Sequence, residues 1–77
     1  MNKLNKVQEI FQTFFDEDTM VITRETSPRD IAEWDSLAQM NLMMIIEKEF
    51  KIKFKINEVL GIQKVGDIID ILDDKLK

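Results

Sequence analysis

Apolar residues recur at helical spacing in three separate segments, and this pattern constrains the fold of the chain more than any other feature. The segments run from about Lys3 to Phe15, from Ser36 to about Phe50 and from about Val65 to Leu76. In each, the i, i+3, i+4 spacing places apolar side chains on one face of a helix. A short helical turn from Asn57 to Leu60 is closed by Gly61, a residue suited to a left-handed C-cap. The chain is therefore predicted to be all-α, a four-helix bundle of three longer helices and one short helix.

Each longer helix has a set of apolar residues that we expect to face a common core. These are Leu4, Val7, Ile10, Phe11, Phe14 and Phe15 in the first helix, Leu42, Ile45, Ile46 and Phe50 in the second, and Val65, Ile68, Ile69, Leu72 and Leu76 in the last. The second helix has more apolar residues than one core-facing stripe can use, so Leu37, Met40 and Met44 share a second face. Gly66 slightly weakens the first turn of the last helix.

The segment between the first two helices shows no sustained period and is predicted to be a long ordered loop. It begins at Asp16–Thr19 with residues that prefer caps and turns. The apolar residues that can hold this loop on the core are Met20, Val21, Ile22 and Ile31. A loop of this length in a small domain is unusual unless it is functional.

Residues 51–56 alternate between lysine and apolar side chains, a pattern that on its period alone describes a short edge strand with a basic solvent side. The sequence leaves that strand open as an alternative. Because no second clear strand is available to pair with it, the favoured interpretation is an extended loop. Such a loop would pack Ile52, Phe54 and Ile56 against the helices.

Length, charge and the missing cysteines limit the classes of protein to which the chain can belong. Its 77 residues fit one domain, residues 1–77, with one modest core. A net charge of −4 repels nucleic acid and anionic lipid surfaces, and no stretch approaches the ~20 apolar residues of a membrane span. Without cysteine, disulfide scaffolds and thiolate zinc sites are excluded. We expect a cytoplasmic monomer with no signal peptide, no nucleic-acid partner and no metal site.

Histidine, cysteine and tyrosine are all absent, which removes the usual general base near neutral pH. A carboxylate pair could still perform acid–base chemistry, but it needs a buried cleft that separates two pKa values, and so small a core offers little room for one. A minimal carboxylate hydrolase is therefore ranked last. We expect no enzyme activity and no catalytic residue.

The residues with chemical character stand at the start of the second helix, in the run Trp34-Asp35-Ser36-Leu37. Asp35 is a good N-cap, since its carboxylate can accept hydrogen bonds from unpaired backbone N–H groups of the helix. At the head of a Met-rich helix near mid-chain, this run resembles the Asp-Ser-Leu attachment site of the acyl carrier protein family. The resemblance covers nearly the whole chain in order and spacing, through Glu47-Lys48-Glu49-Phe50 with Ile52 and Phe54, and through Val65-Gly66-Asp67-Ile68.

The resemblance implies a fold, a prosthetic group and a set of partners. It implies a four-helix bundle of acyl-carrier-protein type, in which Ser36 takes 4'-phosphopantetheine from coenzyme A through a phosphopantetheinyl transferase. The thiol of this arm then carries an acyl or aminoacyl group as a thioester, loaded by a ligase and presented to a downstream synthase or transferase. Asp35 and Leu37 flank the attachment residue, and the family pattern also implies that Asp35 helps to hold a magnesium ion during the transfer.

The second face of this helix has two interpretations. A Met stripe at helical spacing is more often core. The surplus of apolar faces nevertheless favours Leu37, Met40 and Met44 as an adaptable docking surface for partner enzymes. Isolated acidic residues usually do no more than keep a helix face solvated, but three of them are candidates for attracting basic partners to this surface. They are Glu33, Glu47 and Glu49.

The chain also departs from housekeeping fatty-acid carriers, which usually have acids early in the second helix where this chain has Ala38 and Asn41. The run Asp30–Trp34 is one residue longer than the common approach to the motif, and Trp34 replaces a small residue. In both features the chain is similar to discrete carriers of specialised acyl or aminoacyl pathways. Trp34 itself is more readily a loop anchor than a specificity element.

A binding module is the alternative to a carrier. It would be a small helical adaptor that presents the Met-rich face of the second helix to an amphipathic partner, with Ser36 unmodified or phosphorylated. Serine in a first helical turn and aspartate at an N-cap need no function to explain them. The match around the motif favours the carrier.

Overall fold

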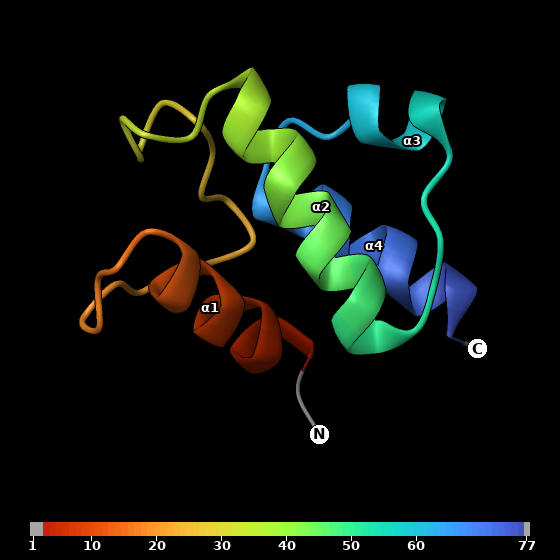
Figure 1. Ribbon diagram of the computed structural model, residues 1–77, viewed down its shortest axis with the longest axis horizontal. Helices are drawn as coiled ribbons and strands as arrows, with labels where there is room; N and C mark the ends of the chain where they lie inside the picture. The colour runs from red at the N-terminus through yellow and green to blue at the C-terminus, as the bar shows by residue number, and fades with distance from the viewer. Residues whose placement is uncertain (1–2, 77) are drawn as a thin grey trace.

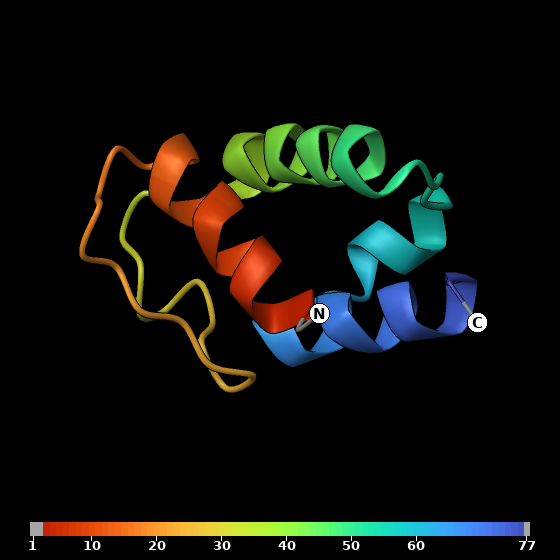
Figure 2. The same cartoon turned by 90° about the horizontal axis from the view of Figure 1, so that it is seen from below.

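Four helices make up the computed structural model, which describes residues 3–76 (Figure 1). They are α1 (Lys3–Phe14), α2 (Ser36–Phe50), α3 (Ile56–Leu60) and α4 (Val65–Lys75). Within these described residues there is no strand, so the all-α prediction is confirmed. The interpretation of residues 51–56 as an extended loop is confirmed for 51–55, because Ile56 already begins α3. In Figure 2, α2 and α4 lie on opposite sides of the molecule, with α1 crossing between them at one end and α3 at the other. None of the helices in residues 3–76 has the length and apolar content needed to cross a membrane.

The core lies where α1, α2 and α4 meet, and it contains most of the residues expected there. Its fully buried large side chains are Val7, Phe11, Leu42, Ile46, Val65, Ile68 and Leu72. Two predictions were wrong. Ile45 is 39% exposed because α3 packs on the other side of α2, where Met43 is buried in its place. Leu76 is 40% exposed because α4 ends at Lys75 and Leu76 is already its C-cap.

The long loop between α1 and α2 is ordered by side chains of α1. The Ile22 N–H donates to Gln8 Oε1 at 2.8 Å, and Gln12 Nε2 donates to the Met20 carbonyl at 2.8 Å. Ile22 and Ile31 are buried as predicted and Met20 packs against the core. Val21 is 76% exposed, contrary to prediction, since its side chain and that of its buried neighbour Ile22 point to opposite sides of the chain.

The same loop is joined to the start of α4 by two backbone hydrogen bonds. Val65 N–H donates to the Thr26 carbonyl and Gly66 N–H to the Arg24 carbonyl, each at 2.8 Å. A Cβ atom at position 66 would lie only 2.9 Å from the Arg24 oxygen. Gly66 therefore permits a close backbone approach, a role beyond the weakened helical turn that the sequence indicated.

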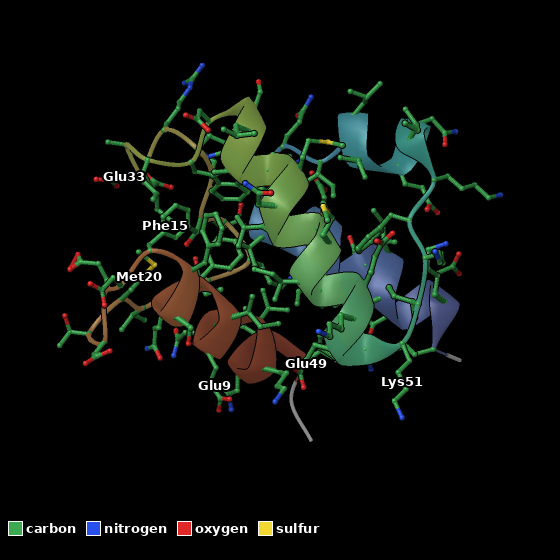
Figure 3. The ribbon with its side chains drawn as sticks, in the orientation of Figure 1. Glu9, Phe15, Met20, Glu33, Glu49 and Lys51 are labelled. Carbon is green, nitrogen blue, oxygen red and sulfur yellow. The ribbon has the colours of Figure 1, made fainter. Side chains whose placement is uncertain are left out.

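The extended segment between α2 and α3 begins with a left-handed residue that is not glycine. Lys51, at the end of α2, has φ 57° and its N–H bonds to the Glu47 carbonyl (Figure 3). The left-handed cap predicted at Gly61 was wrong, since its φ is −87° and the chain leaves α3 through an i to i−3 turn at Ile62. Ile56 was also misplaced: it begins α3 and is 71% exposed.

Two other apolar residues of the segment behave as predicted. Ile52 and Phe54 are partly buried against the core. The backbone between them is fixed by α2, because the Phe54 N–H donates to Glu47 Oε2 at 2.7 Å. This contact ties the extended segment that leads into α3 to the last turns of α2.

Candidate functional site

Asp35 caps the N-terminus of α2, as predicted from the sequence. Its backbone is extended, with φ −106° and ψ −172°. Its Oδ1 accepts from the Ala38 N–H at 2.9 Å, and its carbonyl accepts from the Gln39 N–H at 2.8 Å. The carboxylate thus satisfies one of the orphan donors of the first turn and fixes the point at which the helix begins.

Ser36 is the first residue of α2 and its side chain is exposed. The N–H groups of Ser36 and Leu37 precede the first intrahelical donor, and neither has a backbone acceptor among the described residues. Both therefore remain available to an anion at the positive end of a 15-residue helix. A phosphate ester on the Ser36 hydroxyl fits this environment, and none of the described side chains hydrogen-bonds to that hydroxyl to activate it.

Trp34 fixes the chain immediately before this helix. Its side chain is only 3% exposed, and its ring meets Phe11 edge-on at a centroid distance of 5.1 Å. The indole Nε1–H donates to Gln39 Oε1 at 2.7 Å. These contacts join the end of the long loop to α1 and α2, which confirms Trp34 as a loop anchor.

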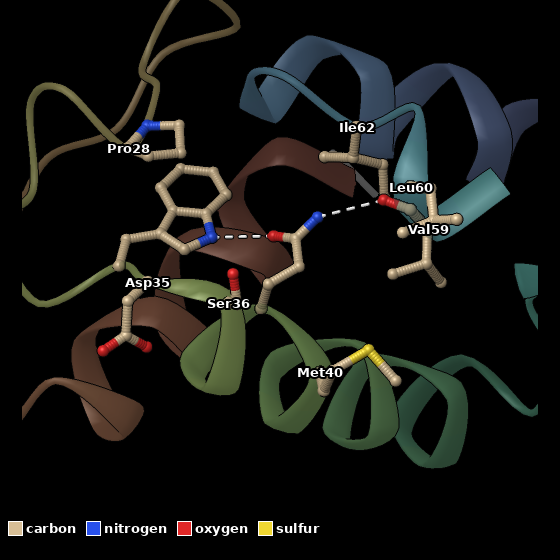
Figure 4. Close-up of a pocket in the computed structure, with 9 residues that line it drawn as sticks. Pro28, Asp35, Ser36, Met40, Val59, Leu60 and Ile62 are labelled. Atoms are coloured by element: carbon tan, nitrogen blue, oxygen red, sulfur yellow. Dashed lines mark hydrogen bonds between the residues drawn. The ribbon is translucent and has the colours of Figure 1, made fainter. Parts of the chain in front are cut away.

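A pocket of about 390 Å³ opens directly beside Ser36 (Figure 4). The long loop, the first turns of α2 and the α3 region all contribute to its wall. Its lining residues are Pro28, Trp34, Asp35, Ser36, Gln39, Met40, Val59, Leu60 and Ile62. Across it, Gln39 Nε2 donates to the Val59 carbonyl at 3.2 Å, so Gln39 joins Trp34 to α3 through the two hydrogen bonds dashed in Figure 4.

The sequence did not identify Gln39, Val59 or Leu60 as site residues. Gln39 carries one detectable signal, because a polar amide three residues after Ser36 interrupts the apolar face that turns towards α3. Nothing comparable marks Val59 and Leu60, since α3 spans only five residues and is too short to show a period. Their position beside Ser36 comes entirely from tertiary packing.

A second pocket, of about 230 Å³, lies further along the groove between α2 and α3. It shares Met40, Val59 and Leu60 with the first pocket. Its other lining residues are Met43, Met44, Glu47, Phe54 and Ile56. The wall is therefore mostly apolar, in contrast to the hydrogen-bonded amide that crosses the first pocket.

The three residues predicted to form a docking surface are all exposed. Leu37 is 72%, Met40 47% and Met44 63% exposed, and their spacing places them on one side of α2. The exposed apolar surface continues onto α3 with Ile56 and Leu60, at 71% and 78%. We call these five residues the α2–α3 apolar face. An uncovered apolar face of this kind is typical of a protein-binding surface.

The three predicted steering acids are spread over the molecule, and Glu47, which lines the second pocket, borders this face. Glu33 lies on the long loop, well apart from Glu49 at the other end of α2 (Figure 3). Glu47 is half-buried and accepts the hydrogen bond from Phe54, while Glu49 forms an ion pair with Lys6 at 3.2 Å. Two of the three acids thus have partners within the protein.

One carboxylate with a shifted pKa stabilises α3, which borders both pockets. The Lys55 N–H donates to Glu58 Oε1 at 2.7 Å, and Lys75 Nζ lies 3.1 Å from the same oxygen. The hydrogen bond from Lys55 is the main reason that the pKa of Glu58 is lowered; partial burial opposes the shift and the Lys75 ammonium adds to it. Glu58 therefore remains charged at neutral pH.

Known proteins resemble the chain in both sequence and structure. A family model described as "Phosphopantetheine attachment site" matches residues 5–72. An acyl carrier protein of Porphyromonas gingivalis is 39% identical over 56 residues, which are 73% of this chain and 72% of that protein. One of Phenylobacterium zucineum is 32% identical over 73 residues, 95% of this chain and 92% of that protein.

The fold leads to the same group of proteins. The solution NMR structure of a holo acyl carrier protein from Geobacter metallireducens superposes with a TM-score of 0.90 at 46% sequence identity. The match covers 99% of this chain and 87% of that one.

Proposed function

The chain belongs to the phosphopantetheine-attachment family and is an acyl carrier protein, and on that premise we propose that Ser36 is the residue to which its phosphopantetheine group is attached. The observation that carries this proposal is the position of Ser36, exposed on the first residue of α2 beside two unpaired backbone N–H groups. These donors and the helix dipole would both stabilise the phosphodiester. The dipole alone contributes about 0.3–1 kcal/mol at an exposed site.

The chain has one other serine, Ser27, which provides an internal comparison. Ser27 lies in the long loop, is half-buried and is engaged within its own turn. Its Oγ lies 3.5 Å from Asp30 Oδ2 and accepts from the Arg29 N–H at 3.3 Å. The hydroxyl of Ser36 is the freer of the two, and it alone stands at a helix N-terminus.

In the transfer reaction, the Ser36 oxygen forms a bond to phosphorus of coenzyme A, and adenosine 3',5'-bisphosphate leaves. Because no described side chain hydrogen-bonds to this hydroxyl, we assign the removal of its proton to the transferase. When bound, the arm supplies a terminal thiol that holds the cargo as a thioester. The chain's own residues orient the attachment point: Asp35 by capping α2, and Trp34 by anchoring the loop that leads to it.

Family membership makes the chain a carrier that works with partner enzymes. Its specific partners in our proposal are a phosphopantetheinyl transferase, an acyl- or aminoacyl-loading ligase and a downstream synthase or transferase. We assign their docking to the α2–α3 apolar face, because it is exposed and directly adjoins Ser36. Asp35, with a second carboxylate oxygen beyond the one that caps the helix, is the residue proposed to contact magnesium during the transfer.

The proposal is tested by incubating the folded protein with coenzyme A, magnesium and a broad-specificity phosphopantetheinyl transferase and measuring its intact mass. We expect wild type and Ser27→Ala to gain one phosphopantetheine, and Ser36→Ala to gain none. Modification of Ser36→Ala, or no modification of a folded wild-type chain by several transferases, would overturn the assignment. The second result would favour the adaptor, which needs no coenzyme A.

A further inference from the structure

The exposed apolar stripe of α2 ends in lysines, at the end of the helix that lies farthest from its first residue. Lys48 continues the stripe of Leu37 and Met44, because the eleven residues from Leu37 to Lys48 are close to three helical turns. Lys51 follows the last residue of α2 and points away from the protein (Figure 3), and Lys53 lies on the solvent side of the extended segment. All three lysines are exposed, and we call them the basic end.

The lysines of the basic end are not neutralised by ion pairs within the protein. None of them forms an ion pair with another described residue. Every described lysine outside residues 48–55 does form one; these are Lys3, Lys6, Lys64 and Lys75. The two acids beside Lys48 are engaged elsewhere, since Glu47 accepts from the Phe54 N–H and Glu49 pairs with Lys6 of α1. The positive charge of the basic end is therefore available to a partner.

The two ends of α2 carry opposite charge. Residues 36–60, which include α2 and α3, have four lysines and three glutamates, a net charge of +1 in a chain whose total is −4. Exposed acids instead precede the first turn of α2, at Glu33 and Asp35. From Ser36 to Lys48 the helix rises by about 18 Å, at about 1.5 Å per residue. A partner that covers the stripe thus meets positive charge at a fixed distance from Ser36.

We propose that the α2–α3 apolar face receives an amphipathic segment of a partner enzyme whose acidic residues meet the basic end, about 18 Å along α2 from Ser36. The inference rests on the attachment of the arm to Ser36, because the arm places the entrance of the partner's active site there. The apolar side of the segment would cover the exposed side chains of α2. The partner is thus opposite in charge to the basic partners that the sequence predicted from Glu33, Glu47 and Glu49.

The test uses two synthetic amphipathic helical peptides that share one apolar side and differ only at one end, which carries glutamates in the acidic peptide and lysines in the basic peptide. Each is titrated into the isotope-labelled protein without its arm, and NMR chemical shifts report the affinity and the residues in contact. We expect the acidic peptide to bind about 8-fold more tightly or better, about 2-fold for each lysine, and to shift the amides of the basic end. The total charge of −4 alone predicts the opposite preference. In about 1 M salt, where the Debye length is about 3 Å, the preference should disappear.

Lys48→Glu and Arg29→Glu are the matched variants. They change the total charge by the same amount, and both residues are exposed and without an ion pair among the described residues, but Arg29 lies in the long loop. Lys48→Glu turns an attraction into a repulsion, so it should weaken the acidic peptide by about 2- to 30-fold. Arg29→Glu should leave the preference for the acidic peptide as it is in wild type.

Three outcomes would overturn the inference. One is tighter binding of the basic peptide by wild type, a measurement that depends on no variant folding. Another is an equal effect of Lys48→Glu and Arg29→Glu. The third is sedimentation of the protein with phosphatidylglycerol vesicles, lost in Lys48→Glu, without a preference for the acidic peptide, which would assign the lysines to an anionic lipid surface.

The peptide titrations and the attachment assay can fail separately. Because the peptides bind the protein without its arm, all three of these outcomes leave the mass gain on Ser36 intact. A folded chain that gains no mass would instead overturn the attachment, and with it the position of the partner's entrance, whatever the peptides show.

Discussion

Replacing Gly66 by alanine should destabilise the protein, although helix propensity alone predicts the opposite. Gly66 is in the first turn of α4, where alanine would normally stabilise a helix by up to about 1 kcal/mol. The new Cβ, however, would lie 2.9 Å from the Arg24 carbonyl oxygen, whereas ordinary contacts begin at 3.4 Å. The loop and the helix must therefore move apart by about half an ångström, the difference between these two distances.

This movement acts on a contact that holds the long loop in place. The Gly66 N–H bonds to the same Arg24 oxygen at 2.8 Å, so the separation weakens that hydrogen bond. Overpacking costs about 1–3 kcal/mol and a lost hydrogen bond about 0.5–1.5 kcal/mol. After the gain in propensity, we expect a net loss of about 1–3 kcal/mol; a loss of about 2 kcal/mol lowers Tm by about 8–16 °C.

Urea unfolding followed by the fluorescence of Trp34, the single tryptophan and almost fully buried, measures the change directly. The control is Gly61→Ala at the chain's only other glycine. There φ is −87° and the nearest atom to the new Cβ is at 3.4 Å, so alanine should be neutral or stabilise by up to about 1 kcal/mol. A Gly66→Ala protein as stable as wild type would refute the close-approach argument.

Substitutions at three carboxylates separate their individual roles. Asp35→Ala removes the acceptor of the Ala38 N–H and should lower the free energy of unfolding in urea by about 0.5–2 kcal/mol. Asp35→Asn keeps this N-cap and should leave the stability nearly unchanged, but it should slow the transferase if the charge binds magnesium. Glu47→Ala deprives the Phe54 N–H of its acceptor and should cost about 1–3 kcal/mol, and Glu47→Gln, which retains an acceptor oxygen, should cost less. The pKa of Glu58 is lowered, first of all by its hydrogen bond from the Lys55 backbone, so the charged carboxylate stabilises the fold. This contribution is fully present above about pH 4.3, the ordinary pKa of glutamate, and is lost as the pH falls through the lowered pKa. Tm measured between pH 7 and pH 3 should therefore fall more for wild type than for Glu58→Gln, and equal slopes would count against the assignment.

The helices were predictable because each carries its own local signals. The spacing of apolar residues located α1, α2 and α4 to within a residue or so, and Asp35 marked the start of α2 through the chemistry of an N-cap. The exposure of Leu37, Met40 and Met44 also followed from local reasoning, since a helix with apolar residues all round cannot bury every face. The sequence of α2 alone therefore predicts that part of its apolar surface is exposed, without knowledge of the tertiary contacts.

The errors fall where a neighbouring element decides the outcome. Met43 replaces Ile45 in the core because α3 packs on its side of α2, a placement that the sequence of α2 does not encode. The left-handed residue that ends α2 is Lys51, whose N–H closes onto Glu47, while Gly61 needs no positive φ. Gln39 shows the same limit at the site. Its partners Trp34 and Val59 lie 5 and 20 residues away in the sequence, and only folding brings both side by side with its amide.

The most direct test of the central claim is to locate the modification on the chain itself. Cleavage of the transferase-treated protein after arginine and lysine releases residues 30–48, in which Ser36 is the only hydroxyl side chain, separately from residues 25–29, which contain Ser27. Tandem mass spectrometry of the peptides should find one phosphopantetheine, on Ser36 within residues 30–48. An adduct on any other peptide, or a folded and treated chain whose 30–48 peptide keeps its unmodified mass, would contradict the account.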